Sequence, residues 1–218
     1  MSNNNDNKKL PIVTIIIVSA VVLTLGYFLF KSSPDKQRQN SNQVSATNDH
    51  HGGSAMAANS DTLNSLIGKP MPDIQLSDKD GKIYTVADFK GKSTVLFFNE
   101  GLMCYPACWN QIALFGSDER FNNGEIQAIS VVVDSANDWK TAIAKMPQLA
   151  KATTMFDANA NASRALGMLT TSSSMHRGSL PGHTYVVIDK EGIVRYVFDD
   201  PNMAMANDML FAKIEELK

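Results

Sequence analysis

Cysteine is scarce in this sequence: the only two, Cys104 and Cys108, lie in one short motif. No cysteine is left elsewhere as a free thiol, which is compatible with an oxidising compartment. The sequence has neither an internal repeat nor a glycine-rich phosphate-binding loop. Concentrated positive charge is also absent, because 20 lysine and arginine residues are balanced by 22 acidic residues and no basic block occurs. The electrostatic footprint of a nucleic-acid-binding protein is therefore missing.

Ionisable side chains are absent from residues 10–30, which read LPIVTIIIVSAVVLTLGYFLF. This apolar run is long enough to cross a bilayer core of about 30 Å as a helix. The alternative, a cleaved signal peptide, has an apolar core of about 7–15 residues and a small-residue cleavage site, and no clear site follows Phe30. We therefore expect a short tail at residues 1–9 and one transmembrane helix at residues 10–30. Lysines flank both ends, but so short a tail favours a single-pass membrane protein whose large domain lies outside the cytoplasm.

Large apolar side chains are almost absent from residues 31–61, which are rich in Ser, Asn, Gln, Gly and Asp. Such a segment cannot bury enough surface to fold. Its composition predicts a disordered linker that acts as a flexible tether. The folded domain is then expected at residues 62–218, a length that can form one core of its own.

Residues 62–218 alternate between strand-like and helix-like hydrophobic periods. Strands are predicted at Ile74–Leu76, Lys82–Val86, Ser93–Phe98, Ile126–Val133, Thr184–Ile188 and Ile193–Phe198. Helices are predicted at Pro106–Phe115, Asp138–Leu149 and Ala204–Leu217. The turn-rich segments DKDG and DKEG join the first two and the last two strands into hairpins. Strands that alternate with helices and close with a hairpin predict an α/β sandwich with a mixed central sheet.

The motif Cys-Tyr-Pro-Ala-Cys connects a predicted buried strand to a predicted helix. Pro106 suits the first helical position, where its missing N–H costs nothing. Cysteines in the first turn lie at the positive end of the helix dipole, which can lower a thiol pKa from about 8.5 into the range of about 3.5–7.5. Cys104 and Cys108 are four positions apart, so they share a helix face and can approach disulfide distance. The motif therefore predicts a redox-active pair.

Two other interpretations of the cysteines compete with redox chemistry. A purely stabilising disulfide is a weak explanation, because so short a loop contributes only about 2 kcal/mol in the chain-entropy model. Two buried and inert cysteines conflict with a position between the end of a strand and the start of a helix. We favour the redox site, and a domain that has kept the fold but lost catalysis is the weakest alternative.

His183 is the third candidate site residue, in the segment LPGHTYVVID just before a predicted strand. In this kind of sheet, that loop faces the start of the cysteine-bearing helix. An imidazole there can act as a general acid or base for a thiol, or as a metal ligand. It can equally cap the loop by hydrogen bonding. Glu100, beside the motif, is either a group that tunes a cysteine pKa or a solvated loop carboxylate.

Four segments resemble the redoxin branch of the thioredoxin superfamily, which includes the alkyl hydroperoxide reductase and thiol-specific antioxidant proteins. They are GKPMPDIQLSDKDGKIYTVADFKGKSTVLFFNEG, CYPACWNQI, AISVVVDSANDWKTA with TMFDANANASRALGM, and GHTYVVIDKEGIVRYVF. The resemblance implies a thioredoxin-like α/β fold, with a mixed central sheet flanked by helices, after the N-terminal transmembrane helix. Together with the transmembrane helix expected at residues 10–30, it implies a membrane-tethered thiol–disulfide oxidoreductase or a peroxiredoxin-like, thiol-dependent antioxidant. Cys104, Cys108 and His183 would be its catalytic residues.

The resemblance also implies partners. The substrate would be a peroxide or a disulfide-bearing protein, and a thiol protein would supply electrons, with no cofactor. Cys104 would be the attacking thiolate and Cys108 the resolving partner, whereas alignment with the peroxiredoxins reverses these roles. An alternative function comes from a similarity to the copper chaperones that assemble cytochrome oxidase, which are membrane-tethered redoxin domains. In that case Cys104, Cys108 and His183 would bind copper(I), since two thiolates and one imidazole suit this soft ion.

Overall fold

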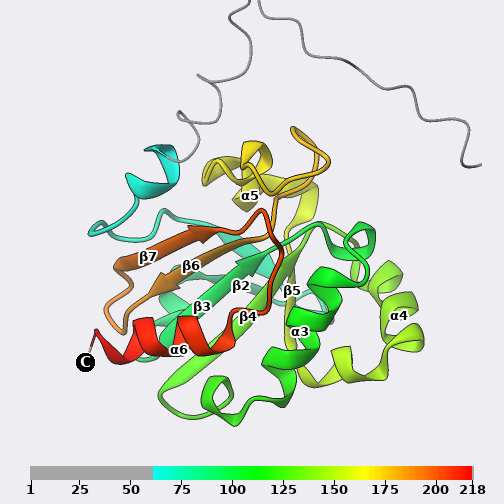
Figure 1. The fold of residues 1–218 in the computed structure, drawn as a ribbon, viewed down its shortest axis with the longest axis horizontal. Coiled ribbons are helices and arrows are strands. Elements are labelled where there is room, and N and C mark those ends of the chain that lie inside the picture. The colour runs from blue at the N-terminus through cyan, green and yellow to red at the C-terminus, as the bar shows by residue number, and fades with distance from the viewer. Residues whose placement is uncertain (1–60, 218) are drawn as a thin grey trace, which may run out of the picture. The chain divides into compact units, whose positions relative to one another are not determined.

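The computed structural model describes residues 61–217 (Figure 1). The expected tail, the expected transmembrane helix at residues 10–30 and the expected linker up to residue 60 lie outside the described residues. Within residues 61–217, no helix combines the length and the apolar character needed to cross a membrane.

A mixed seven-stranded sheet forms the centre of the described residues. In chain order its strands are β1 (Gln75–Ser77), β2 (Ile83–Thr85), β3 (Ser93–Phe98), β4 (Ile126–Val132), β5 (Thr153–Phe156), β6 (Thr184–Ile188) and β7 (Val194–Asp199). In space they follow the order β2-β1-β5-β4-β3-β6-β7. Strand β4 is parallel to β3 and β5, and the other neighbouring pairs are antiparallel. The predicted α/β sandwich with a mixed sheet is confirmed.

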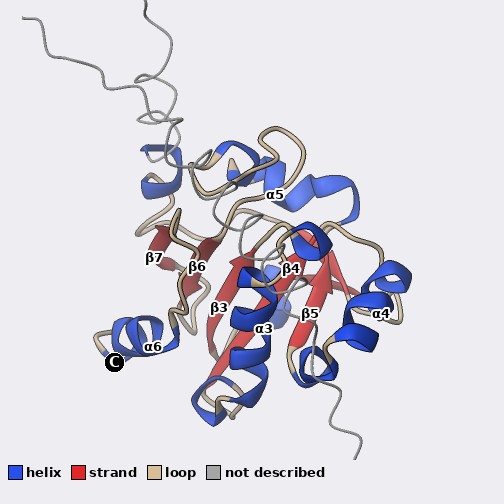
Figure 2. Ribbon diagram, turned by 45° about the vertical axis from the view of Figure 1, so that its right-hand side comes forward, coloured by secondary structure: helices blue, strands red, loops and turns tan. Residues whose placement is uncertain are grey.

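Helices cover both faces of this sheet (Figures 1 and 2). They are α3 (Ala107–Ser117), α4 (Ala136–Lys145), α5 (Asn161–Ala165) and α6 (Asn207–Glu215). Short 3-10 turns lie between the elements: η1 (Val86–Phe89), η2 (Gly101–Met103), η3 (Glu119–Phe121), η4 (Pro147–Lys151), η5 (Ala158–Ala160) and η6 (Met168–Thr170).

Strand β3 shows how the two layers are built, because all of its residues are buried. Successive side chains of a strand point to opposite faces. Val95 and Phe97 pack in the core with α3, α4 and α6, whereas Leu96 and Phe98 pack in the core with α5. A strand covered on both faces reads as a continuous apolar run, which is why STVLFF is recognisable in the sequence.

Two predicted helices are shorter in the structure. The helix predicted at Asp138–Leu149 is interrupted, and Pro147 begins the separate turn η4. Proline has no N–H to donate and its ring clashes with the preceding turn, so it ends the helix. The last helix begins three residues after Ala204, because the Asp200 carboxylate accepts the N–H of Ala204 at 2.8 Å and holds this segment in a loop.

Strand β5 has no counterpart among the strands predicted from periodicity. It has four residues, and only the last two are buried. A run this short shows no alternation from which a strand can be recognised.

Candidate redox site

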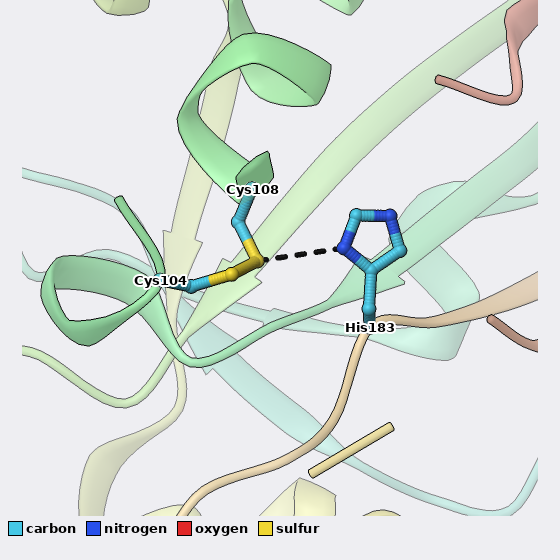
Figure 3. A group of neighbouring side chains, drawn as sticks. All are labelled: Cys104, Cys108 and His183. Atoms are coloured by element: carbon cyan, nitrogen blue, oxygen red, sulfur yellow. Dashed lines mark hydrogen bonds between the residues drawn. A yellow bond between two sulfur atoms is a disulfide. The ribbon is translucent and has the colours of Figure 1, made fainter. Parts of the chain in front are cut away.

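The cysteine motif lies where β3 ends and α3 begins. After Phe98 the chain passes through η2 to Cys104, and Cys108 lies in the first turn of α3. The two cysteines form a disulfide with their Cα atoms 5.4 Å apart (Figure 3). Cys104 is 2% exposed and Cys108 is fully buried. The disulfide is therefore nearly covered by the protein, and the small exposed fraction belongs to Cys104.

His183 lies beside this disulfide because of the sheet register. Strand β6 pairs antiparallel with β3, and Thr184 lies opposite Phe98, so the preceding residue reaches the end of β3. The imidazole points toward the sulfurs (Figure 3), with Nδ1 3.5 Å from Sγ of Cys108. The structure thus brings together all three site residues predicted from the sequence.

The environment of His183 keeps its imidazole neutral. Burial is the main cause and lowers its pKa to about 4, although the negative charge of Asp200 and a hydrogen bond with the Ala204 backbone act in the opposite direction. On the other side of the ring, Nε2 lies 2.7 Å from the hydroxyl oxygen of Tyr185. Burial also raises the pKa of the Tyr185 phenol, so that the hydroxyl keeps its proton. A neutral imidazole can accept a proton from a thiol at Cys108 or donate an N–H to a thiolate there.

The same three residues satisfy the geometry of a metal-binding group. Within the described residues, one ligand atom from each of Cys104, Cys108 and His183 lies within 4.8 Å of the other two. Two thiolates and one imidazole suit copper(I), provided that the disulfide is first reduced. Copper binding stays a prediction.

Glu100 differs from both of its sequence-based interpretations. Its side chain is buried rather than solvated, and its partners lie in a distant loop rather than at a cysteine. Oε1 accepts the N–H groups of Met175 at 2.6 Å and His176 at 3.0 Å, and Oε2 lies 2.9 Å from Nδ1 of His176. Glu100 therefore fixes the loop before β6 against the segment that leads to Cys104.

Gly101 allows η2 to pack closely against the end of β4. Its φ is +57°, and a Cβ here would lie 1.8 Å from Oδ2 of Asp134. The same Oδ2 accepts the N–H of Leu102 at 3.0 Å, and the carbonyl of Gly101 accepts the indole N–H of Trp109 at 3.0 Å. Burial raises the pKa of the Asp134 carboxyl. These contacts fix the backbone on the amino-terminal side of Cys104.

Sequence reasoning did not identify Tyr185 and Asp200 as parts of the site. Tyr185 reads as an ordinary core residue of TYVVI, and its only signal is its position two residues after His183 on the same face of β6. Asp200 follows β7, and its N–H donates to the carbonyl of His183 at 2.9 Å. Only the pairing of β6 with β7 places the Asp200 carboxylate near the imidazole of His183. No local sequence motif therefore predicts that Asp200 belongs to the site.

The chain was compared with known proteins. Residues 66–210 match the family model described as Redoxin. Peroxiredoxin Q, chloroplastic, from Triticum aestivum is 32% identical over 139 residues, which cover 61% of this chain and 58% of the relative. The homologous protein from Sedum lineare is 30% identical over 139 residues, which cover 61% of this chain and 68% of the relative. The chain thus spans less than two thirds of the wheat protein.

Solved structures support the fold. Peroxidoxin BcpB from Mycobacterium tuberculosis superposes with a TM-score of 0.57 at 17% identity, covering 70% of this chain and 98% of the other. The AhpC protein of Enterococcus faecalis gives a TM-score of 0.58 at 15% identity, covering 70% of this chain and 92% of the other. The predicted thioredoxin-like α/β fold is confirmed.

The location expected from the sequence is contradicted. We expected a single-pass membrane protein with its redox domain outside the cytoplasm, whereas the wheat and Sedum relatives are named as chloroplastic peroxiredoxins. The residues that the structure describes also contain no membrane-spanning helix. The expectation rested on the apolar composition of residues 10–30, which lie outside the described part of the chain.

Proposed function

Since the chain belongs to the Redoxin family, we propose that it is a thiol-dependent peroxidase and thiol–disulfide oxidoreductase that cycles Cys104 and Cys108 between dithiol and disulfide. One observation carries the proposal: the two sulfurs are bonded at the start of α3, with Nδ1 of His183 3.5 Å from Sγ of Cys108. The names of the wheat and Sedum relatives agree with peroxide as the substrate.

The cycle begins with the reduced pair. The Cys104 thiolate attacks the terminal oxygen of a peroxide, the O–O bond breaks, and the leaving oxygen takes a proton to give an alcohol or water. Cys104 is now a sulfenic acid. The Cys108 thiol then attacks the Cys104 sulfur, which forms the disulfide and releases water. Two electrons and two protons from a thiol donor restore the dithiol.

Each step has a group in place to support it. Cys104 precedes α3, whose N-terminal dipole favours a thiolate. Neutral His183 can take the proton from the Cys108 thiol as that sulfur attacks, because Nδ1 faces Sγ directly. Burial of the site excludes water from the sulfenic acid while the second bond forms.

Because the chain has only two cysteines, substitution of each one tests the assignment directly. The reduced full-length chain is mixed with one equivalent of hydrogen peroxide, and thiols are counted by alkylation and mass spectrometry. We expect the unaltered chain to lose both thiols. Cys108→Ser should stop at a sulfenic acid on Cys104 that dimedone traps, and Cys104→Ser should give much less product.

Other outcomes separate the alternatives. A sulfenic acid that forms on Cys108 in Cys104→Ser, and not in the other variant, reverses the roles of the cysteines. If the thiols do not react with peroxide but exchange with protein disulfides, the proposed peroxidase activity is wrong. A dithiol that captures stoichiometric copper(I) and then resists peroxide points to metal binding by Cys104, Cys108 and His183 instead.

A further inference from the structure

Exposed apolar side chains gather around the disulfide. Seven large hydrophobic side chains are exposed among residues 61–217: Ile67 44%, Ile83 54%, Met103 58%, Tyr105 66%, Met175 60%, Met205 66% and Leu217 41%. The four most exposed, Met103, Tyr105, Met175 and Met205, all lie on segments that border the site, and we call them the apolar rim. Single exposed apolar residues need no explanation, but a cluster of them marks an interaction surface.

Hydrogen bonds to Glu100 hold two parts of the rim together. Met103 and Tyr105 flank Cys104 in the chain. The N–H of Met103 donates to the carbonyl of Glu100 at 3.2 Å, and the N–H of Met175 donates to the carboxylate of the same residue at 2.6 Å. One buried glutamate therefore positions two rim residues from segments far apart in sequence.

Met205 lies beside α3, the helix that carries Cys108. Its neighbour Ala206 donates its N–H to Oε1 of Gln111 on α3 at 2.8 Å. Met205 also lines an open groove of about 430 Å³ along the outer surface of α3, together with Ala113, Leu114 and Met146. The rim thus continues into a groove beside the helix that carries Cys108, and the lining of this groove is partly apolar and also includes Lys151.

The part of the rim around the cysteines favours an uncharged partner surface. Residues 101–117 contain no Asp, Glu, Lys, Arg or His, so the cysteine loop and the whole of α3 present no charge. A small charged thiol finds no opposite charge on residues 101–117 that would strengthen its binding. A protein whose own cysteine pair lies in an apolar surface would bury the rim, and methionine side chains adapt readily to a partner.

We propose that the apolar rim is the docking surface for the dithiol protein that reduces the Cys104–Cys108 disulfide. The inference rests on the proposed function, which requires such a donor. Of the two cysteines, Cys104 is 2% exposed and Cys108 is fully buried, so we place the attack of the incoming thiolate at Sγ of Cys104, with Cys108 leaving as a thiolate. The second thiol of the partner then attacks the mixed disulfide, so that the partner is oxidised and both cysteines of this chain are reduced.

The double variant Met103→Ser/Met175→Ser tests the docking surface, because both side chains are largely exposed and their removal spares the core. The oxidised full-length chain is reduced either by reduced thioredoxin, used as a probe dithiol protein, or by dithiothreitol. Free thiols are counted against time by alkylation and mass spectrometry. Truncating two interface anchors should lower the rate constant with thioredoxin by about tenfold or more. The rate constant with dithiothreitol should stay within about twofold.

Ile67→Ser/Ile83→Ser is the matched control, since these side chains are exposed and lie at the two edges of the sheet: Ile83 on edge strand β2, and Ile67 next to Gly68, whose N–H donates to Val194 of β7. It should leave both rate constants unchanged. Equal rates for the rim variant and the unaltered chain overturn the proposal, as does an equal loss with both reductants. Thioredoxin that reduces the unaltered chain no faster than dithiothreitol also overturns it. A dimer of this chain that the rim variant dissociates would show instead that a second copy occupies the rim.

These outcomes are separate from those of the proposed function, because no peroxide is present in the assay. A chain that thioredoxin reduces through the rim but that does not consume peroxide would refute the peroxidase and leave the docking surface in place. A chain that consumes peroxide but reacts with thioredoxin independently of the rim would refute the docking surface and leave the proposed peroxidase activity in place.

Discussion

Buried His183 couples the stability of the fold to pH. Burial holds its pKa at about 4, against an ordinary value of 6.5. Because the folded pKa is the lower one, the unfolded chain binds the proton first as the pH falls. Stability that is fully present above about pH 6.5 is then lost progressively down to about pH 4. From these two values, the loss due to His183 is about 2 kcal/mol at pH 5 and about 3 kcal/mol at pH 4.

His183→Gln removes this titration while keeping a neutral polar side chain. Urea unfolding of the oxidised full-length chain and of the variant at pH 7.5, 5 and 4 gives the free energy of unfolding for each. We expect the unaltered chain to lose about 2 kcal/mol more than the variant between pH 7.5 and pH 5. The Asp118 carboxyl, whose pKa is lowered to about 2 mainly by its hydrogen bond with Arg120, is common to both chains and cancels. If the free energies of unfolding of the two proteins change with pH in parallel, burial does not lower the pKa of His183 as argued.

Two further substitutions test the contacts around the site. Tyr185→Phe removes the hydroxyl 2.7 Å from Nε2 of His183 and leaves a buried ring nitrogen without this partner, so urea unfolding should show a loss of about 1–3 kcal/mol. Disulfide formation in the reduced variant should also slow, because the imidazole loses the contact that orients it; unchanged values for both would refute this role of the hydroxyl. Gly101→Ala should cost about 3 kcal/mol, since its φ is positive and the new Cβ collides with Asp134. Gly81→Ala, at a φ of +82° with open space around it, should cost only about 1 kcal/mol in the same measurement.

Local patterns predicted the elements that the site depends on. Strands β3 and β6 have the predicted bounds, because each is a continuous apolar run bounded by polar or turn residues. The two cysteines are four positions apart in the sequence, which keeps their Cα atoms 5.4 Å apart even though only Cys108 lies in α3 and Cys104 precedes it. His183 was recognisable because it directly precedes a buried strand. These features need only short-range information.

The remaining parts of the site depend on long-range pairing. Glu100 and His176 are 76 residues apart, and nothing in either segment indicates that the carboxylate binds the other loop. Asp200 approaches His183 only through the pairing of β6 with β7. Sequence patterns specify which residues are buried, but not which buried polar atoms meet.

The two cysteines lie in different environments, and this difference bears on which sulfur attacks. Cys108 is fully buried in the core cluster that includes Phe97 and Trp109, so a thiolate there would lose most of its hydration. With the disulfide formed, burial keeps the adjacent imidazole neutral, so it places no full positive charge beside Cys108. Cys104 lies just before α3, where the helix dipole favours a thiolate, and is 2% exposed against 0% for Cys108. Negative charge in the reduced protein is therefore less costly on Cys104, which favours Cys104 as the attacking thiolate and Cys108 as the thiol that resolves it.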